Sequence, residues 1–183
     1  VITIKTSKEI QTMREGGKIL GRALKKVAAA VKPGVNIKDL DTLAETLLRE
    51  GGGSPAFLGY GGGRGKMPAY PATLCISIND EVVHGIGTRD ATLKEGDIVG
   101  LDIGVKYPAK NGLFTDMALT VGVGKISPEK QQLMNVTKQS LDNAIALIRP
   151  GVSTLALSKM IQKTCEGAGY SVVRDLTGHG IGH

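Results

Sequence analysis

A motif that occurs twice constrains the fold of this 183-residue chain most strongly. The segment 31–36 reads VKPGVN, and the segment 148–153 reads IRPGVS. The same offset relates Leu40 to Leu157 and Gly52 to Gly169. Apolar residues at three- and four-residue steps flank both copies, which predicts a helix, a Pro-Gly turn and a second helix each time. We therefore expect an internal duplication in which each half runs helix, turn, helix and then strand.

The helices of the first half have clear boundaries in the sequence. The first should begin near Ser7 and end at the Pro33-Gly34 turn, and the second should begin after the N-cap Asn36 and end at Gly51. We expect the first helix to bury one apolar face, made of Ile10, Met13, Leu20, Leu24, Val27 and Val31.

Two later segments, 97–105 and 113–123, alternate as strands do, and residues 106–112 between them favour a hairpin connection. A hairpin centred near Ala109 places Asp102 directly opposite Asp116. One face of this hairpin should then be core, lined by Val99, Leu101, Ile103, Val105, Leu113, Met117, Leu119 and Val121.

The opposite face of the hairpin holds the two aspartates among small residues. Carboxylates opposed across an antiparallel pair repel each other unless a cation or a shared proton lies between them, so we favour a metal site over one aspartate that caps a turn or points to solvent. His179, between glycines, is the candidate nitrogen ligand, and such a donor set suits Mn, Co, Fe or Zn. His84 could contact a substrate or bind metal, or be a histidine whose hydrogen bonds are satisfied within a hairpin.

Composition excludes several classes of protein. Cys75 and Cys165 have no CxxC spacing, so a disulfide framework is not expected and a reducing, cytoplasmic location fits. No apolar run approaches the roughly 18 residues of a membrane span, and the first residues lack a signal peptide, so we expect a soluble protein without a membrane partner. The net charge is +6, and the first 32 residues carry eight Lys and Arg. We favour a solvated helix face, with a face toward RNA or a ribosome as the alternative.

Four motifs together resemble the type I methionine aminopeptidases: SINDEVVHGI at 77–86, GDIVGLD at 96–102, Asp116, and GHGIG at 178–182. The resemblance covers essentially the whole chain. It implies the pita-bread fold, an α/β (α+β) structure in which a pseudo-twofold, curved antiparallel sheet is covered by helix pairs. We expect one catalytic domain over 1–183, with repeats at about 1–125 and 126–183.

The resemblance also implies a function and roles for residues. The family removes the initiator methionine from nascent polypeptides with two divalent metal ions (Co, Mn, Fe or Zn), and a monomer with transient ribosome contact is expected. Asp102 resembles the ligand of one metal, Asp116 the carboxylate that bridges both, and His179 the ligand of the other. His84 resembles the histidine that contacts the substrate and stabilises developing charge, and Tyr70 and Cys75 fall where the family lines its methionine pocket.

Some features depart from the family pattern. The family's second active-site histidine and two glutamate ligands would lie after His183, so the second half is expected to be incomplete, with weak or partial metal occupancy and little or no turnover. The glycine-rich segment 59–66 is longer than usual, and Gly87 stands where the family commonly has proline.

Two other functions compete with this one. A non-catalytic pita-bread protein that binds RNA or a ribosome would suit the basic first helix, although every ligand position reached here is kept. A prolidase would share the metal ligands but carries a separate N-terminal domain, whereas this chain begins almost directly at its first helix.

Overall fold

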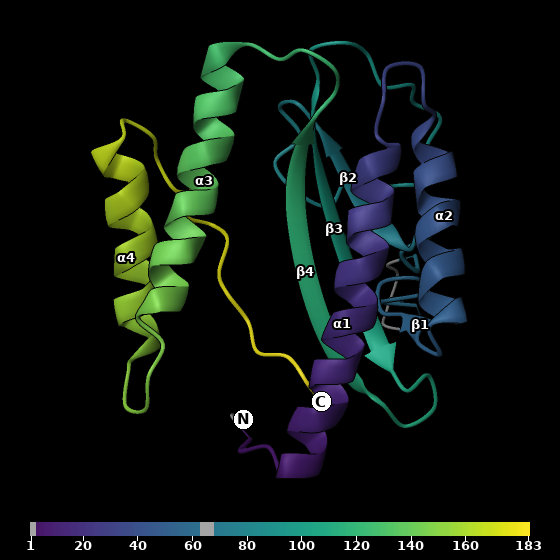
Figure 1. The fold of residues 1–183 in the computed structure, drawn as a ribbon, viewed down its shortest axis with the longest axis vertical. Helices are drawn as coiled ribbons and strands as arrows, with labels where there is room; N and C mark the ends of the chain where they lie inside the picture. Colours follow the sequence, from purple (N-terminus) through teal and green to yellow (C-terminus); the bar gives the residue numbers. More distant parts are fainter. Residues whose placement is uncertain (1–2, 63–67) are drawn as a thin grey trace. The chain divides into compact units, whose positions relative to one another are not determined.

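The computed structural model describes residues 3–62 and 68–183. These divide into two compact units, one containing the described residues up to Ile126 together with Gly180–His183, and the other Ser127–His179. Figure 1 shows the elements of both units. The single domain over 1–183, with its repeat boundary, stays a prediction. The residues 63–66 of the glycine-rich segment lie outside the described ranges.

Helices α1 (Ser7–Ala30) and α2 (Ile37–Glu50) confirm the predicted helix pair of the first unit. A capping box starts α1, because the Thr6 side chain accepts from the Glu9 amide while the Glu9 side chain accepts from the Thr6 amide. Asn36 is the N-cap of α2. The turn between the helices requires Gly34, whose φ is +86°.

The four strands among the described residues form one antiparallel sheet with β3 (Ile98–Tyr107) at its centre. On one side β3 pairs with β2 (Leu74–Ile78) and with the short β1 (Ser54–Pro55), and on the other with β4 (Leu113–Gly122). Strand β4 is therefore an edge of the sheet (Figure 1).

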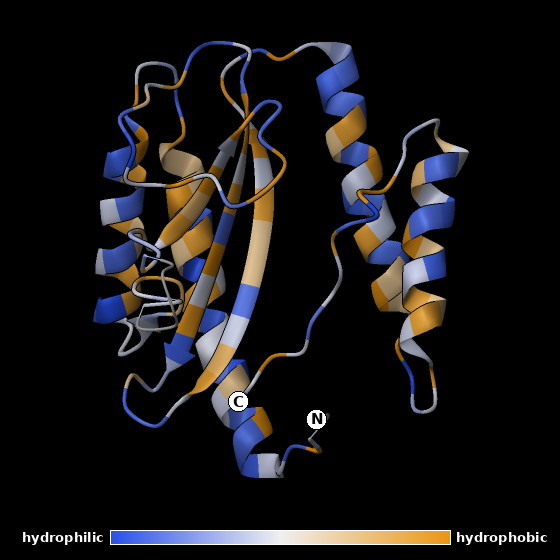
Figure 2. Ribbon diagram, turned by 180° about the vertical axis from the view of Figure 1, so that it is seen from behind, coloured by the Kyte–Doolittle hydropathy of each residue, from blue (hydrophilic) through white to orange (hydrophobic). Residues whose placement is uncertain are grey.

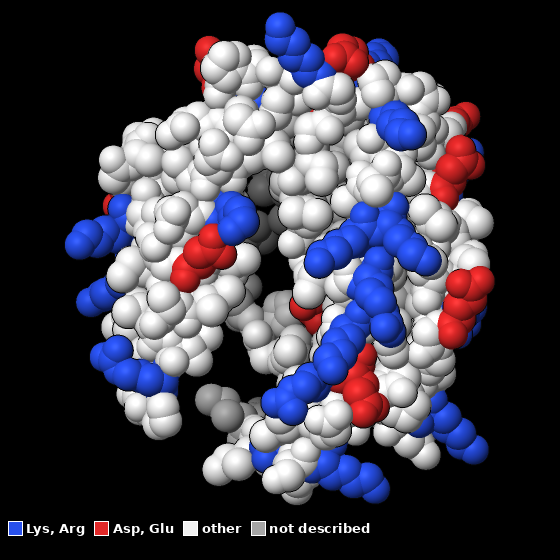
Figure 3. Space-filling view, in the orientation of Figure 1, with Lys and Arg blue, Asp and Glu red and all other residues white. Residues whose placement is uncertain are grey.

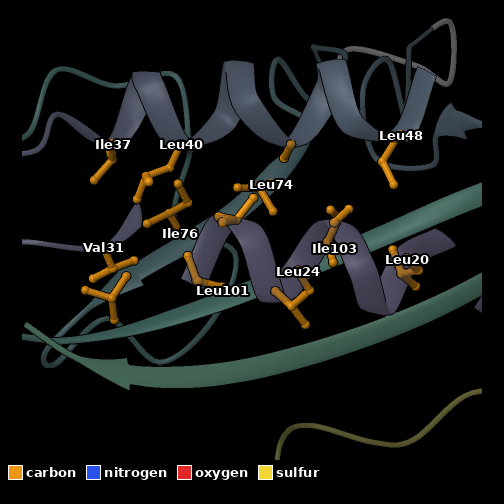
Figure 4. Packing of buried hydrophobic residues seen from close by; sticks show 14 of the residues in the cluster. Leu20, Leu24, Val31, Ile37, Leu40, Leu48, Leu74, Ile76, Leu101 and Ile103 are labelled. Carbon is orange, nitrogen blue, oxygen red and sulfur yellow. The ribbon is translucent and has the colours of Figure 1, made fainter. Parts of the chain in front are cut away.

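Helices α1 and α2 cover one face of this sheet, and the core of the unit lies between the two helices and the sheet (Figure 4). Hydrophobic residues recur along both the helices and the strands (Figure 2). Their periodicity lets one face of each helix and one face of the sheet pack together in the core. The largest fully buried side chains are Leu20, Val27, Ile37, Leu40, Leu48, Leu74, Ile76, Leu93, Val99, Leu101, Ile103 and Val105. The prediction of Ile10 as a core residue was wrong, because its side chain is 47% exposed, whereas Ile19 and Ala23 are buried.

The register of the hairpin differs from the predicted one by two residues. Asp102 lies opposite Ala118, and Asp116 lies opposite Gly104. Pairing continues as far as Tyr107 with Leu113, so the connection is shorter than predicted and turns at Asn111, whose φ is +56°. A shift of two residues leaves every side chain on its predicted face, because the side-chain period of a strand is two.

The prediction that Met117 and Leu119 are core residues was also wrong. They lie on the helix-covered face of β4 but are 40% and 41% exposed, because β4 is an edge strand. Helix α1 approaches closely near Thr115 instead. A Cβ on Gly16 would lie 3.3 Å from its hydroxyl oxygen, and Thr115 and Leu113 are buried.

The second unit contains the helices α3 (Pro128–Ala146) and α4 (Thr154–Gly167), capped by Ser127 and Ser153. Their Pro-Gly turn and helix end repeat the backbone of the first pair, with φ of +84° at Gly151 and Gly169 compared with +86° and +82° at Gly34 and Gly52. The predicted strand after the fourth helix is not formed among residues 168–183. In that stretch only Gly182 makes a bridge, with Phe114 of β4.

None of the helices in the described residues is both long enough and apolar enough to cross a membrane.

The assignment of the core can be tested on a cross-strand pair, since Leu101 of β3 lies directly opposite Leu119 of β4. Leu101→Ala should lower the free energy of unfolding by about 2–5 kcal/mol, because Leu101 is fully buried. Leu119→Ala should cost less than about 1 kcal/mol, because the side chain is already half exposed. Urea unfolding monitored by circular dichroism measures both, and equal losses would contradict the assignment.

Candidate metal centre

Asp102 and Asp116 lie on the face of the sheet opposite α1 and α2. Their strands are adjacent, and the register places them as diagonal neighbours, each directly opposite a small residue. Diagonal neighbours on one face have Cα atoms about 7–8 Å apart, with the Cβ atoms somewhat closer. Carboxylate oxygens bind zinc-like ions at about 2.0–2.2 Å, so two side chains reaching toward each other leave room for an ion between them.

The surroundings of the two aspartates partly exclude water. Both side chains are partly buried. Glycines Gly100 and Gly104 flank Asp102 on the same face, and a Cβ on Gly104 would lie 2.9 Å from both the Ala56 Cβ and the Phe57 ring. Phe57 therefore forms an apolar wall beside the residue paired with Asp116. A pair of oxygen ligands in such a site fits a hard or borderline divalent cation.

Strand β2 adds Cys75 to the same face, directly opposite Asp102 on the other side of β3. Cys75 is buried, and burial is the main cause that raises the pKa of its thiol, to which the charges of Asp102 and Asp116 add while a hydrogen bond with Tyr70 opposes. Burial, followed by the hydrogen bond with Cys75, likewise raises the pKa of Tyr70. The structure thus brings four of the predicted site residues together: Tyr70, Cys75, Asp102 and Asp116.

His84 lies on the loop that follows β2 and has a φ of +59°. The next residue anchors this loop to β2, because the Gly85 carbonyl accepts from the Ile76 amide at 2.7 Å and the Gly85 amide donates to the Ser77 hydroxyl at 3.2 Å. Arg89 adds a second anchor, since it donates to the Ile76 carbonyl and pairs with Glu81 at 2.5 Å. His84 is exposed on this loop, whose backbone is anchored to β2 by the contacts of Gly85 and Arg89.

His179 lies in the second unit, in the segment that follows α4, and is exposed. Within the described ranges, no three His, Cys, Asp or Glu side chains lie close enough together to hold a metal ion. The first unit supplies a pair of carboxylates, and His179 as the third ligand stays a prediction.

Asp41 was not predicted as a site residue, yet it is buried on the inner face of α2. Its carboxylate accepts from the Leu74 amide at 2.7 Å, at the first residue of β2. A signal was available, because Asp41, Ala44 and Leu48 share a helical spacing, and a charged residue at an inward position of an amphipathic helix needs a buried partner.

Comparison with known proteins identifies relatives over the whole chain. The model of metallopeptidase family M24 matches residues 11–183. The methionine aminopeptidase of Clostridium acetobutylicum is 42% identical over 182 residues, which cover 100% of this chain and 69% of that protein. Methionine aminopeptidase 1 of Bacillus subtilis is 39% identical over 183 residues, again 100% of this chain and 69% of that protein.

Solved structures show the same fold. Methionine aminopeptidase from Thermotoga maritima superposes with a TM-score of 0.91 at 38% identity and covers 100% of this chain and 69% of its own. A prolidase from Pyrococcus furiosus, 20% identical with a TM-score of 0.76 over 91% of this chain and 45% of its own, shares the fold alone. These findings confirm the predicted pita-bread fold and the resemblance to type I methionine aminopeptidases over the alternatives. The chain belongs to metallopeptidase family M24, within which it groups with the methionine aminopeptidases.

Proposed function

We propose that the protein is a metal-dependent aminopeptidase that removes the initiator methionine from nascent polypeptides. The observation that carries the proposal is the placement of Asp102 and Asp116 on one small-residue face of β3 and β4, in a chain that belongs to this peptidase family. The names of the relatives support methionine as the residue removed.

Asp102, Asp116 and His179 would hold the metal. When bound, divalent Co, Mn, Fe or Zn supplies Lewis-acid polarisation of the scissile carbonyl and an activated water. Three of the five ligands that the resemblance implies fall within these residues, so we expect weak or partial occupancy. The chain spans 69% of the length of its relatives.

The remaining predicted residues would bind and orient the substrate. Tyr70 and Cys75 meet beside Asp102, where they would line the pocket for an unbranched apolar side chain such as that of methionine. His84, held by Gly85 against β2, would donate a hydrogen bond to the carbonyl oxygen on which negative charge develops.

We also propose a cytoplasmic monomer that makes a transient contact with the ribosome, and the surface of α1 supports the contact. A line of Lys and Arg side chains runs along this helix (Figure 3). It includes Lys18, Arg22, Lys25 and Lys26, all exposed. A row of cations attracts the phosphates of RNA, and this attraction weakens with added salt.

The metal site can be tested with Asp116→Asn, which removes one charged ligand and preserves shape. We expect the affinity for Mn²⁺, measured by isothermal titration calorimetry, to fall at least about tenfold. Loss of a residue that only hydrogen-bonds to a metal ligand already lowers metal affinity about 10–100-fold, and Asp116 would be a ligand itself. Asp39→Asn, an exposed aspartate of α2, is the control of equal charge and should leave the affinity unchanged. Unaltered Mn²⁺ affinity in a folded Asp116→Asn protein would remove Asp116 from the site.

Catalysis is tested by release of the first residue from Met-Ala-Ser and Ala-Ala-Ser peptides at saturating Mn²⁺. Any release should be slow, specific for methionine and abolished by EDTA. Equal cleavage of both peptides, or cleavage in EDTA, would contradict the proposal.

A further inference from the structure

Asp41 is the one charged side chain among the buried residues that the structure describes, with 5% of its surface exposed. Burial raises the pKa of its carboxyl, while the amides of Leu74 and Thr73 act in the opposite direction. Burying a carboxylate costs free energy unless hydrogen bonds replace its water. Asp41 also occupies an inward helix position that would otherwise take an apolar residue. The groups that Asp41 contacts therefore indicate its role.

The main contact of Asp41 is at the start of the pocket strand. Its Oδ1 accepts from the Leu74 amide at 2.7 Å. Leu74 immediately precedes Cys75, and its carbonyl accepts from the Tyr70 hydroxyl at 3.1 Å. The peptide groups on either side of Leu74 are thus held by Asp41 and Tyr70, which fixes the backbone that presents Cys75.

The loop that carries His84 also contacts Tyr70 and Asp41. The Tyr70 hydroxyl also lies 3.1 Å from the Gly85 carbonyl, to which it donates. Gly87 is buried against Asp41, because a Cβ on Gly87 would lie 2.8 Å from the Asp41 Oδ1 and 2.8 Å from the Leu74 carbonyl oxygen. The backbone on the far side of His84 therefore passes directly over Asp41.

We propose that Asp41 is a positioning residue for the substrate pocket. From α2, Asp41 fixes the backbone at the start of β2 and at Gly87, where the 79–87 loop ends. The positions of Tyr70, Cys75 and His84 depend on these two stretches of backbone. Asp41 itself contacts neither substrate nor metal in this account. The assignment of Tyr70, Cys75 and His84 to a substrate pocket rests on the proposed function. The effect of Asp41 on the backbone at Cys75 does not depend on that function.

The test uses the Cys75 thiol as a local probe. Asp41→Ala should increase the rate of Cys75 alkylation by iodoacetamide at least tenfold at 20 °C, because the Leu74 amide loses its acceptor and the strand start opens. Peptide mass spectrometry separates Cys75 from Cys165, which lies in the other unit and should react at an unchanged rate. Asp41→Asn keeps one acceptor oxygen and should restore protection to within threefold of the unsubstituted protein.

Two controls separate positioning from general destabilisation. Asp39→Asn removes an exposed charge from the same helix and should not alter the rate. Val27→Ala removes buried apolar volume from α1 and lowers the free energy of unfolding without touching Asp41. If Cys75 alkylation follows the free energy of unfolding equally in Val27→Ala and Asp41→Ala, the role of Asp41 is general stability and the inference is overturned.

A second measurement keeps this inference distinct from the proposed function. Mn²⁺ with L-methionine should slow Cys75 alkylation at least fivefold in the unsubstituted protein, whereas Mn²⁺ with L-lysine should not. The Asp41→Ala protein should lose this protection. If methionine fails to protect while Asp41→Ala still exposes Cys75, the proposed pocket is wrong and Asp41 remains a positioning residue of β2. If methionine protects both proteins equally, the pocket stands and the inference about Asp41 fails.

Discussion

The antiparallel pairing of β3 with β4 is the constraint on which the rest of the structure depends. Side chains alternate between the two faces of a strand, so the pairing decides at once what enters the core and what faces the metal site. Leu101 and Ile103 point toward α1 and α2, while Asp102, between them, points away. A slip of β4 by one residue relative to β3 would turn Asp116 toward the core and Leu113 and Thr115 away from it. The hydrophobic effect thereby fixes the face on which the carboxylates appear.

Much of the first unit could be predicted from local signals. Thr6, Asn36 and Gly34 mark helix ends by hydrogen-bonding and backbone requirements that involve only nearby residues. Strand alternation placed both aspartates on the correct face even though the register was off by two residues. The register itself depends on the turn at Asn111 and on how far pairing continues, which a periodic pattern does not contain.

Errors arose where burial depends on distant elements. Met117 and Leu119 alternate like core residues, yet they lie on an edge strand and are 40% and 41% exposed, whereas Thr115, beside Gly16 of α1, is buried. Ile10 lies on the periodic face of α1 but remains exposed. Among the residues after α4, only Gly182 pairs with a strand, through its bridge to Phe114. The proximity of Cys75 to Asp102 follows from the pairing of β2 with β3, residues far apart in the chain, and the contact of Asp41 with Leu74 is equally non-local.

The central claim is that Asp102 and Asp116 bind a divalent ion on the face of the sheet opposite α1 and α2. Crystals of the protein grown with Mn²⁺ and measured at a wavelength where manganese scatters anomalously test it directly. The account predicts an anomalous peak about 2.0–2.3 Å from carboxylate oxygens of both aspartates, at the distances typical of such ligands. A peak bound elsewhere, with none between these two side chains at saturating Mn²⁺, would contradict it.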